Sequence, residues 1–122
     1  NMVASIKNGQ SAKKACISQV RKKACESVLN VLWNEGFISG YRMSKNDPKT
    51  LKIFLKYKNK KPIINSINVL SKPSLRIYYS LKQLWKLDSS KGVVIISTNE
   101  GFMSLNDCKQ KKLGGEPFII IK

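Results

Sequence analysis

The sequence predicts an α+β protein made of two small lobes, and three features of the chain support this expectation. Apolar residues recur at helical spacing over residues 18–36, and after Gly36 the pattern changes to a period of two. A second group of apolar runs, GVVIIS and PFIII, lies near the end of the chain. Between the two groups stands SKPS at 71–74, where Pro73 would interrupt a strand ladder. We therefore expect lobes at residues 1–70 and 71–122.

The first lobe is predicted to contain two helices on a three-stranded antiparallel sheet. Residues 1–14 indicate a short helix that ends near Gly9 and is followed by a basic loop. Residues 18–36 indicate the longer helix, with Ser18 as its N-cap and Gly36 at its end. Residues 37–43 and 50–57 alternate as paired strands across the turn-rich SKNDPK, and 63–70 supply the third strand.

The second lobe is predicted to be mainly antiparallel β with one short helix. Residues 75–79 read as a strand, and 80–87 as one or two helical turns. The run at 92–97 is typical of a buried strand, and 117–121 closes the fold as another. Between them, Ser104 and Asp107 have the spacing of a capping box at the start of a short helix, and Gly114 is the expected C-cap.

The net charge indicates a polyanionic partner. Twenty-three Lys and Arg residues against seven Asp and Glu residues give +16, an excess that costs stability by self-repulsion. The longest apolar runs are about five residues, far short of the ~20 that span a bilayer, so nucleic acid is favoured over a membrane. Nearly all the basic residues are Lys, which suits backbone phosphates. An AT-rich genome would produce the same Lys, Asn and Ile bias, and composition does not separate these explanations.

Composition also argues against an enzyme. The chain has no His, which removes Ser-His-Asp triads and most zinc sites, and it has no phosphate-binding GxxxxGK[ST] motif. Three Cys without a CxxC pair indicate ordinary thiols in a reducing compartment. Cys108 has lysines nearby but no base, so a structural role is favoured. No catalytic residue, metal site, cofactor or small-molecule substrate is predicted.

Two short segments near the end allow two interpretations each. STNEG, Ser97 to Gly101, offers hydroxyl and amide groups to RNA, or it is an ordinary hairpin turn that satisfies its own backbone. LGGE either stops a helix or lets backbone amides approach a ligand. Of Tyr78 and Tyr79, one should face the core while the other could stack on a base. The lysine clusters at 13–14, 22–23 and 58–61 are solvated faces that together could track phosphates.

The segment GVVIISTNEGFMSLNDCKQKKLGGEPF resembles the closing signature of the bacterial-type small-subunit ribosomal protein eight family. In that family a strand runs into Ser-Thr-Ser-x-Gly, a short helix follows, and Gly-Gly-Glu comes next. The resemblance continues upstream, in the same order, through SIKNGQ, VLNVLWNEGFI, LKY and SKPSLRIY. It implies a two-lobed, non-enzymatic protein that binds small-subunit rRNA directly, stabilises its central domain and adjoins other small-subunit proteins.

The resemblance also implies which residues touch RNA. Ser97, Thr98 and Gly101 correspond to the RNA-binding loop, and Asn99 takes the place of the loop's third hydroxyl. The remaining implied RNA-contacting residues are Lys7, Asn8, Tyr78, Gly114, Gly115 and Glu116.

Departures from the family pattern point to an unusual ribosome. Glu100 stands where small or basic residues are usual, and Lys109 replaces an Arg. With the Lys, Asn and Ile bias, these departures favour a mitochondrial ribosome, with a plastid or a bacterial cytoplasm as alternatives. The alternative function is a free-standing RNA-binding regulator or chaperone outside the ribosome.

Overall fold

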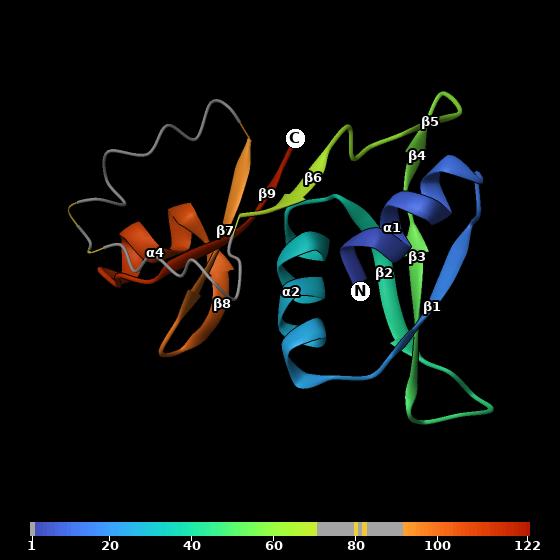
Figure 1. Cartoon of the computed structure of the whole chain (residues 1–122), viewed down its shortest axis with the longest axis horizontal. Coiled ribbons are helices and arrows are strands. Elements are labelled where there is room, and N and C mark those ends of the chain that lie inside the picture. The colour runs from blue at the N-terminus through green and yellow to red at the C-terminus, as the bar shows by residue number, and fades with distance from the viewer. Residues whose placement is uncertain (1, 71–79, 81, 83–91) are drawn as a thin grey trace. The chain divides into compact units, whose positions relative to one another are not determined.

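The computed structural model of the protein describes residues 2–70, 80, 82 and 92–122. The predicted strand at 75–79, nearly all of the predicted helix at 80–87, and the expected junction at 71–74 lie outside the described residues. The chain divides into two compact units, Asn1–Asn65 and Ser66–Lys122 (Figure 1). This division comes earlier in the chain than the lobe boundary expected after Leu70.

The first unit is built around a three-stranded antiparallel sheet in the order β1-β3-β2. Its elements in chain order are α1 (Met2–Ser11), β1 (Cys16–Val20), α2 (Lys23–Asn34), β2 (Ile38–Met43), β3 (Thr50–Leu55), β4 (Tyr57–Lys58) and β5 (Lys61–Pro62). The last two strands form a separate two-stranded hairpin. The predicted pairing of 37–43 with 50–57 is confirmed, because β2 pairs with β3 in antiparallel register.

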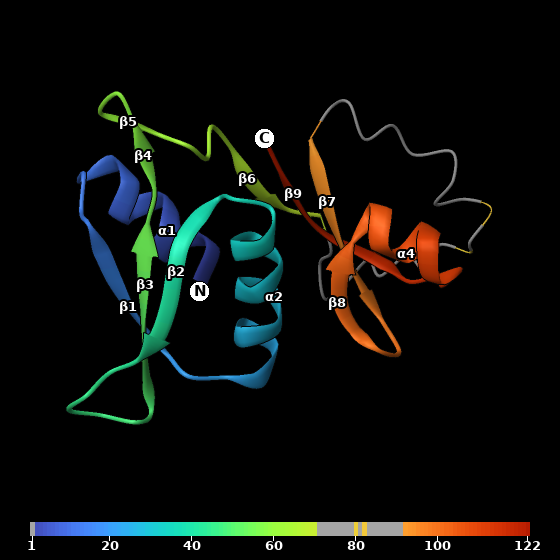
Figure 2. The same cartoon turned by 180° about the vertical axis from the view of Figure 1, so that it is seen from behind.

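The core of the first unit lies on one face of this sheet. Alternate residues of β3, Leu51, Ile53 and Leu55, are buried, whereas the residues between them are only partly covered. Helix α1 packs against β1 and β3, and α2 packs against β2. In Figure 1, α1 lies in front of the sheet, and in Figure 2 it lies behind it, so the opposite face carries no helix of this unit.

Two predictions about the first unit are wrong, and packing explains both. Residues 16–20 form a strand instead of leading into the helix, because pairing of Ile17 with Ile53 buries Ile17 on the core face. Helix α2 therefore begins at Lys23, and Lys22, not Ser18, is its N-cap. Helix α1 ends at Ser11, close to the end predicted near Gly9, and Gly9 itself lies inside the helix. A Cβ at Gly9 would stand 2.5 Å from Ile17 Cγ2, so the glycine allows helix and strand to touch.

The described part of the second unit contains a four-stranded antiparallel sheet in the order β6-β9-β7-β8, together with helix α4. Its described elements are β6 (Ile67–Val69), β7 (Val93–Thr98), β8 (Gly101–Ser104), α4 (Leu105–Lys111) and β9 (Glu116–Ile121). Helix α4 packs on β7 and β8, and it shares a buried cluster with them (Val94, Ile96, Met103, Leu105 and Cys108). The predicted α+β class is confirmed, with two helices on a three-stranded sheet followed by antiparallel strands and a short helix.

One strand was predicted in the wrong sheet. Residues within 63–70 were expected to complete the N-terminal sheet, but Ile67 pairs with Ile121 and Val69 with Ile119 of the second unit. Strand β1 takes the third place in the first sheet. An apolar run predicts a strand, but the partner depends on which distant strand offers a free edge at matching register.

Candidate nucleic-acid interface

The segment STNEG forms the tip of a β-hairpin. Strands β7 and β8 pair in antiparallel register from Ile95 with Ser104 to Thr98 with Gly101. This pairing leaves only Asn99 and Glu100 as the turn, and both are exposed. Gly101 has φ +107, a backbone conformation that side chains with a Cβ rarely adopt, although nothing lies within 4 Å of the position of such a Cβ. Backbone conformation, rather than space, therefore requires glycine at this position.

The Thr98 hydroxyl holds this tip together. Its Oγ1 donates to the Gly101 carbonyl oxygen at 2.7 Å and accepts from the Glu100 amide at 3.1 Å. These are the local hydrogen bonds expected if STNEG is an ordinary turn. They also fix the geometry of the tip before any ligand arrives. A hydroxyl has one donor and two acceptor positions, so Thr98 retains the capacity to accept one more hydrogen bond.

The double glycine brings the start of β9 against the hairpin. Ser97 pairs with Glu116 across β7 and β9. Gly115 is buried, and a Cβ on it would stand 2.4 Å from the Ser97 carbonyl oxygen and 2.7 Å from Ile96 Cγ2. The absence of a side chain at Gly115 is therefore explained by close approach to the protein's own strand. Ser97, Thr98, Gly115 and Glu116 consequently lie together at one end of the sheet.

Helix α4 supports this end of the sheet, and its first turn has the predicted cap. The Ser104 side chain accepts from the Asp107 amide at 3.3 Å, and Ser104 is almost fully buried. The helix ends differently from the prediction, because Lys112, not Gly114, takes the left-handed conformation, with φ 57. The Leu113 amide then donates to the Cys108 carbonyl at 2.9 Å, which closes the last turn in the manner of a Schellman motif.

Cys108 lies in the core beneath this helix. Its side chain is fully buried among the apolar residues of the cluster that α4 shares with β7 and β8. Burial, and to a lesser extent the neighbouring Asp107 carboxylate, raises the pKa of the Cys108 thiol to about 11. The thiol is therefore protonated near neutral pH, which fits the structural role favoured from the sequence.

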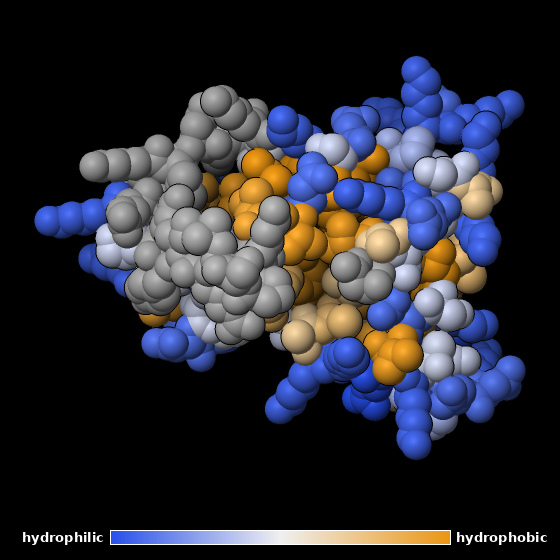
Figure 3. Space-filling model, viewed as in Figure 1, coloured by the Kyte–Doolittle hydropathy of each residue, from blue (hydrophilic) through white to orange (hydrophobic). Residues whose placement is uncertain are grey.

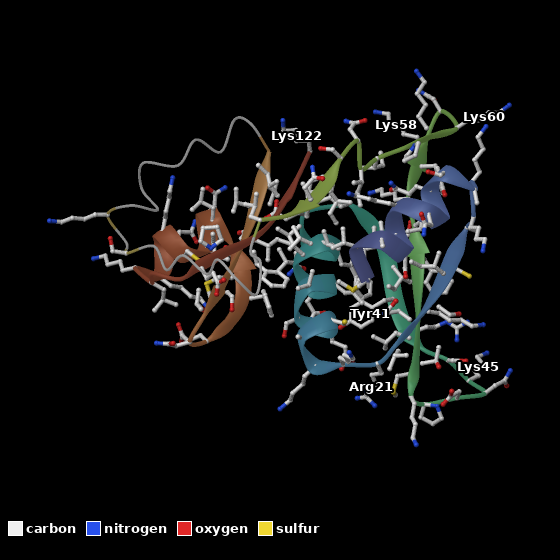
Figure 4. The ribbon with its side chains drawn as sticks, viewed as in Figure 1. Arg21, Tyr41, Lys45, Lys58, Lys60 and Lys122 are labelled. Atoms are coloured by element: carbon white, nitrogen blue, oxygen red, sulfur yellow. The ribbon has the colours of Figure 1, made fainter. Side chains whose placement is uncertain are left out.

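A second group of polar residues lies in the first unit, where two lysine clusters that are distant in sequence come together. The Tyr57 hydroxyl of β4 donates to the Lys14 carbonyl oxygen at 2.6 Å and ties the β4–β5 hairpin to the α1–β1 loop. We call Lys13, Lys14, Lys58, Lys60 and Lys61 the basic end of this unit, and all five are exposed. Figure 4 shows Lys58 and Lys60 projecting outward from the hairpin, and Figure 3 shows hydrophilic side chains extending beyond it.

The excess charge is unevenly shared between the two units. Fourteen of the twenty-three basic residues and three of the seven acidic residues lie in Asn1–Asn65, which leaves that unit with a net charge of +11. The second unit carries the remaining +5. In the first unit, the described part shows Arg21 in an ion pair with Glu26, with Nε and Oε2 separated by 3.4 Å. The first unit is therefore the main source of long-range attraction for a polyanion.

The structure brings some of the sequence-predicted site residues together and leaves others apart. Ser97, Thr98, Asn99 and Gly101 lie at the hairpin tip, and Gly114, Gly115 and Glu116 lead into the neighbouring strand. Lys7 and Asn8 are exposed on α1, which belongs to the other unit. Tyr78 lies outside the described residues.

Sequence reasoning missed an aromatic pair beside the hairpin tip. Phe102 is the direct cross-strand partner of Ser97. Its ring meets that of Phe118 edge-on, with the ring centroids 5.2 Å apart, and both residues are half-buried. Alternation within β8 could have placed Phe102 on the same face as Ser97 once the hairpin register was known. The register itself depends on the turn having two residues, and the sequence alone did not indicate that length.

The described residues also show what this part of the chain does not contain. None of its helices is long and apolar enough to cross a membrane. Across residues 2–70 and 92–122 there is no group of His, Cys, Asp or Glu side chains that could hold a metal ion.

Comparison with known families identifies the chain's relationships. The family model for Ribosomal protein S8 matches residues 1–121. The chain belongs to the ribosomal protein S8 family. This is a family of structural, non-enzymatic ribosomal proteins, and the chain is accordingly not an enzyme.

Individual members of the S8 family align over most of the chain. The small ribosomal subunit protein uS8 of Wigglesworthia glossinidia brevipalpis is 41% identical over 116 residues, which is 95% of this chain and 89% of the relative. The uS8 protein of Buchnera aphidicola subsp. Cinara cedri is 40% identical over the same shares. That of Mycoplasmoides gallisepticum is 40% identical over 120 residues, covering 95% of this chain and 90% of the relative. These similarities support a structural role in the small ribosomal subunit.

Proposed function

We propose that the chain binds small-subunit rRNA directly and stabilises the central domain of that RNA during assembly. The β7–β8 tip and the start of β9 would contact one defined RNA site. The basic end of the first unit would add affinity that does not depend on sequence. The observation that carries this proposal is the hairpin tip, whose geometry is fixed by the Thr98 hydrogen bonds and by the close approach of Gly115.

The chemistry of the tip suits structured RNA. RNA helices and distorted loops are recognised through shape, 2′-hydroxyls and a few base edges, which small polar groups can reach. Thr98 retains one acceptor position, and the exposed Asn99 side chain offers both a donor and an acceptor. Because the tip is already ordered, binding RNA would require little further loss of conformational entropy there.

Charge supplies the remaining part of the affinity. Each phosphate neutralised by a lysine releases counterions, so affinity falls steeply with salt concentration. The five lysines of the basic end are exposed, and they are part of the first unit's net charge of +11. Glu100 and Glu116 lie at the hairpin end, and their carboxylates repel phosphates. That end is therefore better suited to positioning the protein on one RNA site than to attracting the RNA backbone.

The decisive experiment compares specific and nonspecific RNA binding in variants of the tip. Ser97→Ala should weaken binding to a small-subunit rRNA fragment by about 1–3 kcal/mol, which is the usual cost of leaving a buried donor or acceptor without its hydrogen-bond partner. Binding to a scrambled RNA of equal length should barely change. Thr98→Ser keeps the hydroxyl and should bind the rRNA fragment nearly as well as the native chain. Thr98→Val removes the hydroxyl and should bind the rRNA fragment more weakly. Gln110→Ala, an exposed change on α4, serves as the matched control.

Lysine variants test the other half of the proposal. Lys58→Ala with Lys60→Ala should reduce the slope of log affinity against log salt concentration by about 1–2, and should do so on both RNAs. Equal losses on cognate and scrambled RNA for the Ser97 variant would contradict the placement of the specific site. An unchanged salt slope for the lysine variant would mean that the basic end faces solvent or another protein.

A free-standing RNA-binding regulator or chaperone is the competing proposal. Sedimentation with the small subunit at moderate salt separates the two, since a ribosomal constituent stays in the particle. Crosslinking to neighbouring small-subunit proteins in the same particles would test the expected protein partners.

For the compartment, we propose a bacterial-type ribosome. The similarity to bacterial relatives supports the bacterial alternative, and none of these relatives supports the expected mitochondrial location. The sequence of the co-purified rRNA would decide between a bacterium, a plastid and a mitochondrion.

A further inference from the structure

The face of the first unit's sheet that points away from the helices has a composition that calls for an anionic partner. Its residues follow from the strand register, because cross-strand partners share a face. Cys16 pairs with Phe54, Ser18 with Lys52 and Val20 with Thr50, and on the other side Arg42 pairs with Lys52. None of these faces the buried Leu51, Ile53 and Leu55. We call this surface the outer face.

Two positive charges stand directly opposite each other on the outer face. Arg42 and Lys52 are cross-strand neighbours on β2 and β3, an arrangement that destabilises a sheet. Strands β1, β2 and β3 contain no Asp or Glu that could offset the repulsion. The acidic residues of this unit are engaged elsewhere in two cases: Glu26 pairs with Arg21, and Asp47 accepts from the Thr50 hydroxyl at the end of the sheet.

An aromatic platform lies beside these charges. The Arg42 guanidinium stands over the Phe54 ring, with Cζ 5.5 Å from the ring centroid. The direct partner of Phe54 on β2 is Gly40, which contributes no side chain next to the ring. Gly40 itself is buried, because the Trp33 ring of α2 lies 3.1 Å from the position of a Cβ there. Val20, at the far end of β1, is 60% exposed. Planar guanidinium groups and aromatic rings are the groups on which unpaired bases stack, and stacking does not require a particular base.

We propose that the outer face binds an unpaired RNA segment, with a phosphate between Arg42 and Lys52 and a base stacked on the Arg42–Phe54 pair. The phosphate relieves the repulsion between the two cations, and the base covers apolar surface that the fold leaves open. A protein partner fits less well, because it would have to supply carboxylates at the same spacing, whereas every nucleotide carries its phosphate at a fixed distance from its base. The site is distinct from the β7–β8 tip, and it relies on the proposed function only for the class of partner.

The test measures binding of the full chain to two fluorescent RNAs by anisotropy, an oligouridylate of roughly ten nucleotides and a duplex of equal length. Arg42→Lys keeps the charge but removes the stacking plane, so it should lower single-strand affinity about tenfold, within the range expected for one stacked base. Duplex affinity should stay within about twofold of the native value. Phe54→Leu should act in the same direction. The matched control is Lys45→Gln, which removes a charge from the loop between β2 and β3 (Figure 4).

Lys52→Gln provides a readout that a purely structural role would not produce. It removes the repulsion from Arg42, so the melting temperature should rise slightly while single-strand affinity falls. If Arg42→Lys and Phe54→Leu lose no more single-strand affinity than Lys45→Gln, the proposal is wrong. It is also wrong if duplex affinity falls as much as single-strand affinity. Loss of ribosome association with unchanged single-strand binding would contradict it too, because that result would indicate a protein contact. Ser97→Ala should leave oligouridylate binding unchanged, so failure of the hairpin site and failure of this site are distinguishable.

Discussion

Replacing Gly115 with Ala should destabilise the second unit and weaken specific RNA binding together. The new Cβ would stand 2.4 Å from the Ser97 carbonyl oxygen and 2.7 Å from Ile96 Cγ2. The side chain of Ile96 could rotate, but the carbonyl is part of β7 and cannot move alone. Restoring ordinary van der Waals distance needs a separation of about 1 Å between the start of β9 and β7, which is enough to break a hydrogen bond.

The cost can be estimated from overpacking in other proteins. Forcing a methyl group into a filled site typically costs about 1–3 kcal/mol. The lower entropy of the unfolded chain with Ala in place of Gly returns about 0.4–1 kcal/mol of this. A net loss of about 1–2 kcal/mol remains, which corresponds to a melting temperature lower by roughly 4–10 °C for a chain of this size.

Thermal unfolding and RNA binding measured on the same samples provide the assay. Ser97 and Thr98 would be displaced with the strand, so affinity for the cognate rRNA fragment should fall while affinity for scrambled RNA stays the same. Asn106→Ala, at an exposed position on α4, is the control for a neutral change in the same unit. An unchanged melting temperature and unchanged cognate affinity would show that β9 can move away from β7 without cost, and would refute the reasoning.

Four further predictions concern stability and the reactivity of the buried thiol. Ser104→Ala removes the cap on the Asp107 amide and should lower the free energy of unfolding by about 1 kcal/mol, measured by urea titration. Lys60→Gly should raise the free energy of unfolding by about 0.5–1 kcal/mol, because Lys60 has φ 65 in the left-handed region. Lys61→Gly, in the extended β5, should lower it. Because the Cys108 pKa is raised from 9.0 to about 11, the unfolded chain loses this proton first. The free energy of unfolding should therefore fall as the pH rises from 9 to about 11, and Cys108→Ala should remove that pH dependence. Near neutral pH, maleimide should label Cys16 and Cys25 before the buried Cys108, and equal labelling of all three would contradict the burial.

Local pattern was sufficient for most elements of the fold. Helical spacing predicted α2, alternation predicted the β2–β3 pair, and apolar runs predicted β7 and β9. The Ser104 cap was predicted because capping depends only on residues three positions apart. The errors fall where the local signal is short. Strand β1 has only five residues, and it contains Ser18, a residue type that commonly caps a helix.

The candidate site divides in the same way. The sequence indicated the residue types at the hairpin tip, and the family resemblance indicated which of them to consider. Neither indicated that the Thr98 hydroxyl would bond within the turn, nor that Gly115 would be buried against Ser97. Those facts depend on the register of three strands, and register is fixed by packing across the sheet rather than by any single segment.

The sequence by itself determined the α+β class, the positive charge, the absence of histidine chemistry and the order of motifs that marks the S8 family. Each of these is a property of composition or of residues close together in the chain. Only the tertiary structure decided that β6 joins the second sheet and that two distant lysine clusters meet at Tyr57. It also decided that Arg42, Lys52 and Phe54 share one open face. Such contacts arise when segments far apart in sequence bury their apolar residues together, and no local pattern encodes which segments will meet.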